Sequence, residues 1–100
     1  MKAQKIVPLG PATVKPGDIL EEEFLKPLAM TQSELAARMG VGKMRVSELV
    51  RGQRAITAET AILLAMALGT SPRFWMNLQT SHDLAKAALK MRVGKLRRAV

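Results

Sequence analysis

Apolar residues recur every three or four positions between residues 18 and 85, and no segment alternates apolar and polar residues with a period of two. Spacings of i, i+3 and i+4 put apolar side chains on one face of a helix, whereas a period of two is typical of a strand. The pattern therefore predicts an all-α domain of five helices around one core. The predicted apolar stripes are Leu20, Phe24 and Leu28; Leu35, Ala36 and Met39; Val46, Leu49 and Val50; Ala61, Leu64, Ala65 and Leu68; and Phe74, Trp75 and Leu78.

Capping residues predict where the helices begin and end. Thr31 with Glu34 forms a capping box, in which each side chain binds a free backbone N–H of the other residue. Thr57 is placed to cap the fourth helix, and Pro72 suits the first position of the fifth, since a proline there loses only a donor that would be free anyway. The remaining predicted boundaries are Asp18 at the start of the first helix and Pro27, Gly40, Gly52 and Gly69 at the ends of the first four.

Proline, glycine and charge divide the chain into three parts. Residues 1–17 contain three prolines and two glycines, which disfavour a helix and predict a flexible, extended N-terminal arm. Residues 18–85 contain the predicted helices. Residues 86–100 contain six Lys and Arg and no acid, and Gly94 should interrupt a helix there, so we expect a separate basic C-terminal extension.

The second and third predicted helices have the features of a helix-turn-helix. Residues 40–42, Gly-Val-Gly, join them, and Gly40 can adopt the positive φ of such a turn. Ala36 is small enough for the two helices to approach closely. Each feature is weak alone, but the cap, the turn, the small residue and the apolar phase all agree.

The third helix is the predicted DNA-reading element. Opposite its apolar stripe lie Met44, Ser47, Glu48 and Arg51, with Lys43 and Arg45 on the flanks. A recognition helix enters the major groove with its N-terminal residues first, so the two flanking cations can contact phosphates or guanine edges while Met44 meets a thymine methyl. In the second helix, Gln32 and Ser33 can hold a phosphate with the free backbone donors of the first turn. The candidate DNA-binding residues are Gln32, Ser33, Lys43, Met44, Arg45, Ser47, Arg51 and Arg54. A solvated basic surface is the alternative for any single cation.

Glu48 does not fit a phosphate-binding face, because its carboxylate repels phosphate. It could accept a hydrogen bond from a cytosine amino group, or it could pair with Arg51 or Arg45. We expect the ion pair.

Composition narrows the classes of function. Lys and Arg number 16 against 8 Asp and Glu, a net charge of +8 that favours an anionic partner such as nucleic acid or a membrane surface. With no cysteine and one histidine, His82, the chain is expected to hold no metal and no cofactor. No nucleophile, base and orienting residue converge, so no enzyme is expected. The longest apolar run, residues 61–68, is too short to span a membrane, and the N-terminus lacks a secretory signal, so we expect a cytoplasmic protein without a membrane partner.

Four segments resemble the HigA antitoxins, also known as VapI-like plasmid-maintenance antidote proteins, within the lambda-repressor-like Xre helix-turn-helix superfamily. They are P-G-D-I-L-x-E-E-F-L from residue 16, T-Q-S-E-L-A from 31, R-x-I-T-A-E-T-A from 54 and T-S-P-x-F-W-x-N-L-Q from 70. The resemblance implies a homodimer that binds double-stranded operator DNA, represses its own operon and neutralises a HigB-like mRNA-cutting toxin by forming a complex. By motif position, Phe74, Trp75 and Leu78 correspond to a core element near the dimer contact. Gly42 departs from the family, where a serine commonly caps the third helix.

Two other functions fit the same residues. A stand-alone Xre-type repressor would have the same fold without a toxin, and a pure protein-interaction module would bind DNA weakly and without sequence preference. The four acids of the first predicted helix, Asp18, Glu21, Glu22 and Glu23, contrast with the basic remainder and could contact a cationic toxin. Equally, they could only stabilise the start of the helix.

Overall fold

The computed structural model describes the backbone of residues 14–99 and the side chains of residues 14–92. Most of the expected N-terminal arm, residues 1–13, and the side chains of the last eight residues lie outside the described part. The elements are α1 (Pro16–Ile19), η1 (Leu20–Leu25), α2 (Gln32–Met39), α3 (Lys43–Val50), α4 (Ala58–Leu68) and α5 (Pro72–Ala99). α1 and η1 are consecutive turns of one N-terminal helix, so the described residues form five helices and no strand, as predicted.

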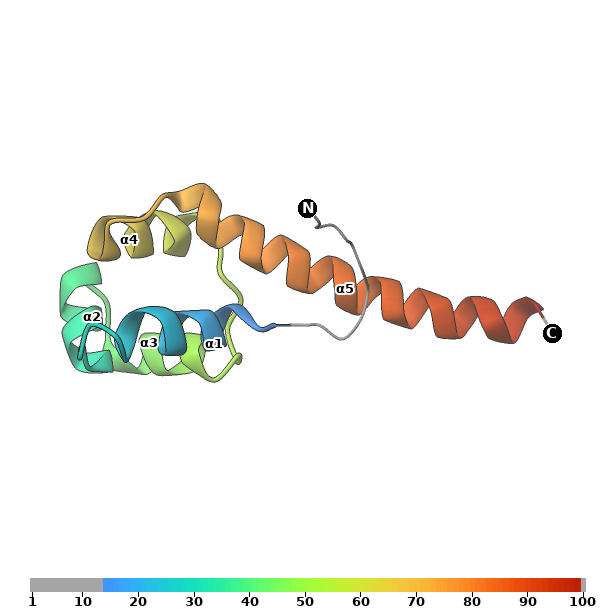
Figure 1. Ribbon diagram of the computed structural model, residues 1–100, viewed down its shortest axis with the longest axis horizontal. Coiled ribbons are helices and arrows are strands. Elements are labelled where there is room, and N and C mark those ends of the chain that lie inside the picture. Colours follow the sequence, from blue (N-terminus) through green and yellow to red (C-terminus); the bar gives the residue numbers. More distant parts are fainter. Residues whose placement is uncertain (1–13, 100) are drawn as a thin grey trace.

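The helices lie in two layers (Figure 1). α1, α2 and α3 form one layer, and α4 with the first turns of α5 forms the other. Between them lies the core, which contains Leu20, Leu25, Leu35, Ala36, Met39, Val46, Leu49, Ile56, Ala61, Leu64 and Trp75. Trp75 is completely buried, with its ring centroid 5.2 Å from that of Phe24 and 4.9 Å from that of Phe74. Its Nε1 donates a hydrogen bond of 2.6 Å to Thr70 Oγ1, so the polar N–H of the buried indole has an acceptor.

The N-terminal helix differs from the prediction. It begins at Pro16 and widens into a π-helical turn, in which the N–H of Lys26 donates to the carbonyl of Glu21 at 3.0 Å. It ends before Pro27, as predicted, so Leu28 lies outside the helix and does not share its apolar face. That side chain is 55% exposed, and Leu25 is buried in its place. The prediction that Leu28 belongs to the core is wrong for this reason.

The predicted caps are confirmed. Thr31 N donates to Glu34 Oε1 at 2.8 Å, and Glu34 N donates to Thr31 Oγ1 at 3.0 Å. Thr57 Oγ1 accepts from Thr60 N, and Gly40, which ends α2, has a φ of 74°. These local contacts fix the ends of α2 and α4, the helices on either side of α3.

α1 packs directly against the C-terminal end of α3 at Gly17. A Cβ on this residue would overlap the carbonyl oxygen of Leu49 and lie 2.5 Å from that of Val50. Only a glycine allows this approach, so the N-terminal helix rests on the last turn of α3.

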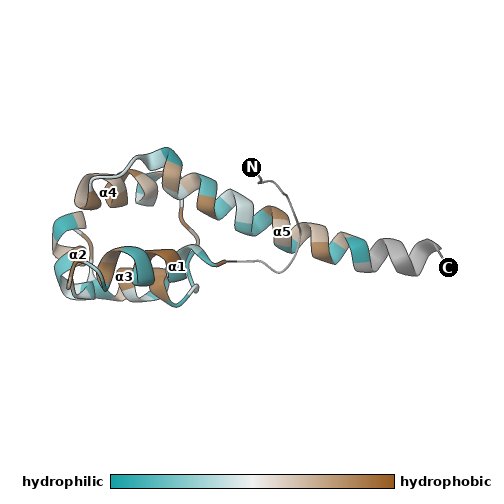
Figure 2. Ribbon diagram, viewed as in Figure 1, coloured by the Kyte–Doolittle hydropathy of each residue, from teal (hydrophilic) through white to brown (hydrophobic). Residues whose placement is uncertain are grey.

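α5 continues through Gly94, so the predicted break there is wrong. Glycine in a helix interior costs only about 0.5–1 kcal/mol, and good helix formers surround it. No break separates residue 85 from residue 86, and the second half of α5 projects beyond the two layers (Figure 1). Hydrophobic and hydrophilic residues are interspersed along the projecting part (Figure 2), where Leu84, Leu89 and Met91 are exposed.

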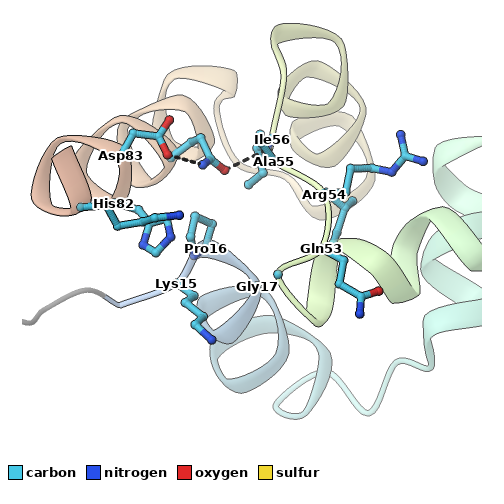
Figure 3. A pocket seen from close by; sticks show the side chains of 13 residues that line it. Lys15, Pro16, Gly17, Gln53, Arg54, Ala55, Ile56, His82 and Asp83 are labelled. Atoms are coloured by element: carbon cyan, nitrogen blue, oxygen red, sulfur yellow. Dashed lines mark hydrogen bonds between the residues drawn. The ribbon is translucent and has the colours of Figure 1, made fainter. Parts of the chain in front are cut away.

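Gln79 joins α5 to the loop between α3 and α4. Its Oε1 accepts the N–H of Ile56 at 2.8 Å, and its Nε2 donates to Asp83 Oδ1 at 2.9 Å (Figure 3). Both Ile56 and Gln79 are buried, so the N–H of Ile56 has no access to water and the side-chain amide of Gln79 is its hydrogen-bond acceptor.

We predict that Gln79→Leu lowers the free energy of unfolding by about 1–3 kcal/mol, because the N–H of Ile56 then stays buried without an acceptor. Urea denaturation measures the change. Gln53→Leu is the matched control: this glutamine is exposed in the same loop, and its replacement should stay within about 0.5 kcal/mol. Equal effects of the two variants would show that the buried amide has no special role.

Candidate nucleic-acid interface

α2, the turn and α3 form the predicted helix-turn-helix. The chain leaves α2 through Gly40, whose left-handed conformation lets Val41 N donate to the carbonyl of Ala36 at 3.0 Å. α3 then begins at Lys43, directly after Gly42, and no side chain caps it. Val46 and Leu49 are buried, so the inner face of α3 is fixed against the core.

The outer face of α3 carries a large apolar side chain between cations. Met44 is 67% exposed, and both Lys43 and Arg51 are exposed as well. Ser47 lies on the same side and is half-buried. The three exposed side chains can reach a surface that approaches α3 from outside, as the sequence predicted.

The first turn of α2 provides free backbone donors beside this face. The N–H of Glu34 bonds the capping Thr31 hydroxyl, and that of Leu35 bonds the Thr31 carbonyl. The N–H groups of Gln32 and Ser33 precede the first intrahelical bond and therefore stay available to an anion. The Ser33 side chain is exposed and that of Gln32 is half-buried.

Glu48 forms an ion pair, but with Arg54 rather than with either predicted partner. Nε and Nη2 of Arg54 donate to Glu48 Oε1 at 3.0 and 2.8 Å. Gly52, with a φ of 76°, reverses the chain after α3 and brings Arg54 back alongside Glu48. Helical spacing identifies only partners that lie within a few residues along the helix, which is why Arg51 or Arg45 was predicted. It does not identify Arg54, which the turn at Gly52 brings back to Glu48.

Arg45 is turned toward α4. Its Nη2 donates to Thr60 Oγ1 at 3.1 Å and lies 3.6 Å from Glu59 Oε1. The side chain is 27% exposed, far less accessible than Met44. No pattern within α3 indicated this contact, because Thr60 is fifteen residues away along the chain.

The three candidate dimer residues differ in accessibility. Phe74 is 37% exposed and Leu78 is half-buried, whereas Trp75 has no exposed surface. Trp75 is therefore a core residue in this chain and offers no surface to a second copy.

A cavity of about 540 Å³ lies between the start of α1, the loop between α3 and α4, and α5. Gln79 and Asp83 on its wall bond each other, and the Arg54 side chain points away from it (Figure 3). Within residues 14–92, no three His, Cys, Asp or Glu side chains gather closely enough to bind a metal ion. Nor does the described part of the chain contain a helix with the length and apolarity needed to cross a membrane.

Comparison with known proteins places the same residues in a family. A helix-turn-helix family model, HTH_3, matches residues 22–75. Virulence-associated protein I of Dichelobacter nodosus is 43% identical over 74 residues, which are 74% of this chain and 68% of that protein. Antitoxin HigA-1 of Vibrio cholerae is 46% identical over 71 residues, 71% of this chain and 67% of that one. The solved structure of the Pseudomonas aeruginosa antitoxin HigA with the higBA promoter superposes with a TM-score of 0.77 at 35% identity, covering 89% of this chain and 96% of that one.

We predict that Glu48→Gln strengthens binding to DNA of arbitrary sequence. Without the carboxylate, Arg54 is free to neutralise a phosphate, which steepens the slope of log affinity against log salt by about 0.9. The surface ion pair contributes at most about 1 kcal/mol, so the fold should persist. The slope is measured by fluorescence anisotropy with labelled DNA at several salt concentrations.

Glu23→Gln is the control for this experiment, because it removes the same negative charge at an exposed residue of another element, η1. If both variants steepen the slope equally, net charge alone is responsible and the position of Glu48 is irrelevant.

Proposed function

We propose, because the chain belongs to the helix-turn-helix family and within it to the HigA-like antitoxins, that the protein is an autorepressor that binds operator DNA. Its recognition helix in this proposal is α3. The observation that supports this most is the outer face of α3, where Lys43, Met44 and Arg51 are exposed on a helix whose inner face is buried. The proposal assigns the protein to the cytoplasm, where its DNA lies, and gives it no catalytic role.

Each exposed group of the motif has a chemical counterpart in the major groove. The free N–H groups of Gln32 and Ser33 suit a phosphate at one edge of the groove and set the register of the domain. Lys43, at the start of α3, suits a phosphate or a guanine edge, and Met44 suits the methyl group of thymine. Arg51 lies at the other end of α3, where it suits the opposite phosphate backbone.

A dimer is part of the proposal because one recognition helix reads only a few base pairs. Two copies related by a two-fold axis place their recognition helices in successive major grooves, about 34 Å apart. The exposed apolar residues of α5, namely Phe74, Leu84, Leu89 and Met91, are the surface we assign to this contact.

Neutralisation of a toxin is the second half of the proposed function. A toxin that cuts mRNA binds a polyanion and therefore carries cations, which an acidic surface of this protein can engage. Asp18, Glu22 and Glu23 are exposed on the N-terminal helix. A hydrogen bond from Lys26 to Glu22, 2.9 Å long, raises the pKa of Lys26 and partly compensates one of these charges. A stand-alone repressor without a toxin is the alternative function, and it would leave this acidic surface without a partner.

We predict that selection from random DNA yields a palindrome whose half-sites lie about 10 base pairs apart, and that the protein sediments as a dimer at micromolar concentration. Sequencing of the retained fragments and analytical ultracentrifugation provide the two measurements. A monomer that retains single half-sites would contradict the dimer, and retention of DNA without any sequence preference would contradict the repressor.

We predict that Glu22→Gln combined with Glu23→Gln slows association with a co-expressed toxin and makes the association rate less sensitive to salt, because steering by opposite charge is lost. Surface plasmon resonance at two ionic strengths measures the rate. The charge-matched control replaces Glu48 and Glu59 by Gln, on α3 and α4. Unchanged rates at low salt would place the toxin contact on another surface.

A further inference from the structure

Arg45 differs from the exposed cations of α3 because its guanidinium is held by α4. Besides the bond to Thr60 Oγ1 and the approach of Glu59, its Nε is shielded from solvent and has no partner among the described residues. A base-reading arginine needs its planar set of donors directed toward the groove. The guanidinium of Arg45 is directed into the protein instead.

Thr60 is a rigid anchor for this side chain. It is 1% exposed and lies in the first turn of α4. Its N–H and its hydroxyl both contact the capping hydroxyl of Thr57, at 3.3 and 3.2 Å. Arg45 therefore bonds the capped first turn of α4, through a hydroxyl that DNA cannot touch.

The N-terminal turn of α3 needs such an anchor. The buried residues of this helix, Val46 and Leu49, are the fourth and the seventh of its eight residues, and Gly42 provides no capping side chain. Lys43 and Met44 thus lie in an uncapped first turn, ahead of both buried residues. Arg45 is in the same turn, and its bond to Thr60 ties that turn to α4.

We propose that Arg45 is a positioning residue that sets the orientation of the first turn of α3, and that Lys43, Met44 and Ser47 determine the base preference. This inference rests on the proposed function, since it assigns roles within the same DNA-binding surface. It departs from the sequence-based expectation that Arg45 itself contacts a guanine edge or a phosphate. Turning the Nη2 donors of Arg45 toward the groove would break the bond to Thr60 and the contact with Glu59.

Thr60→Val and Arg45→Met test the assignment together, because Thr60 cannot contact DNA. Each variant should lower affinity for the selected operator about tenfold, the loss of one hydrogen bond to a charged group. Any change in base preference should be the same in both variants, because both misplace the same turn, and the salt slope should stay as in the wild type. The double variant should lose little more than either single one, since both remove the same bond.

Two results would overturn the assignment. Relaxed preference at one operator position in Arg45→Met, absent in Thr60→Val, would make Arg45 a base reader. A salt slope lowered by about 0.9 in Arg45→Met would make it a phosphate contact.

The NMR chemical shift of the Met44 methyl group shows whether Arg45 orients the first turn of α3 or only stabilises the fold. It reports the surroundings of this side chain in the folded protein without DNA. It is assigned with Met44→Leu and measured at a temperature at which every variant is folded. Thr60→Val and Arg45→Met should both shift it. Arg38→Met is the matched control, since Arg38 ties α2 to α4 by a 3.2 Å bond to the Ala67 carbonyl and should leave the resonance in place.

A resonance unmoved by Thr60→Val and Arg45→Met would contradict the positioning role. If the wild type retains no DNA sequence selectively, the proposed function fails, and the Met44 resonance still tests the contact between Arg45 and α4 by itself.

Discussion

Burial of Val46 and Leu49 is the constraint on which the rest of the structure depends. α3 has eight residues, too few for a stable isolated helix, so it forms because the domain covers its inner face. The same burial fixes the rotation of the helix and thereby exposes Met44 and Arg51. The contact of Gly17 with the last carbonyls of α3 adds a second constraint, because it allows the N-terminal helix to pack on the last turn of α3 without a side chain between them. The outer face is thus a consequence of the core.

Contacts within the protein determine which of its cationic side chains are available to bind DNA. The net charge of +8 gives no indication that Glu48 holds Arg54 or that Arg45 bonds Thr60. With these two arginines engaged, Lys43 at the start of α3 and Arg51 directly after its end are exposed and belong to none of the ion pairs among the described residues. Charge attracts the protein to any DNA, whereas the exposed groups of α3 can distinguish sequences. The pairing of charges therefore bears directly on how selective the surface is.

The sequence predicted those features that depend on neighbouring residues. The Thr31–Glu34 box, the left-handed Gly40 and the apolar phase of α3 each involve residues within about one helical turn, and each is confirmed. The exposure of Leu28 was missed because the apolar spacing was continued past Pro27, beyond the end of the helix. The continuation of α5 through Gly94 was missed because one glycine is a weak breaker. The bonds of Arg45 and Arg54 depend on how separate segments come together, which no periodicity records.

The central claim is that α3 reads the major groove, and methylation interference tests it most directly. Dimethyl sulfate modifies guanine N7 in the major groove and adenine N3 in the minor groove, so one experiment examines both. The account predicts that methylated guanines within each half-site are excluded from the bound fraction, whereas methylated adenines are retained. Interference from adenine N3 alone would place the protein in the minor groove and contradict the role given to α3.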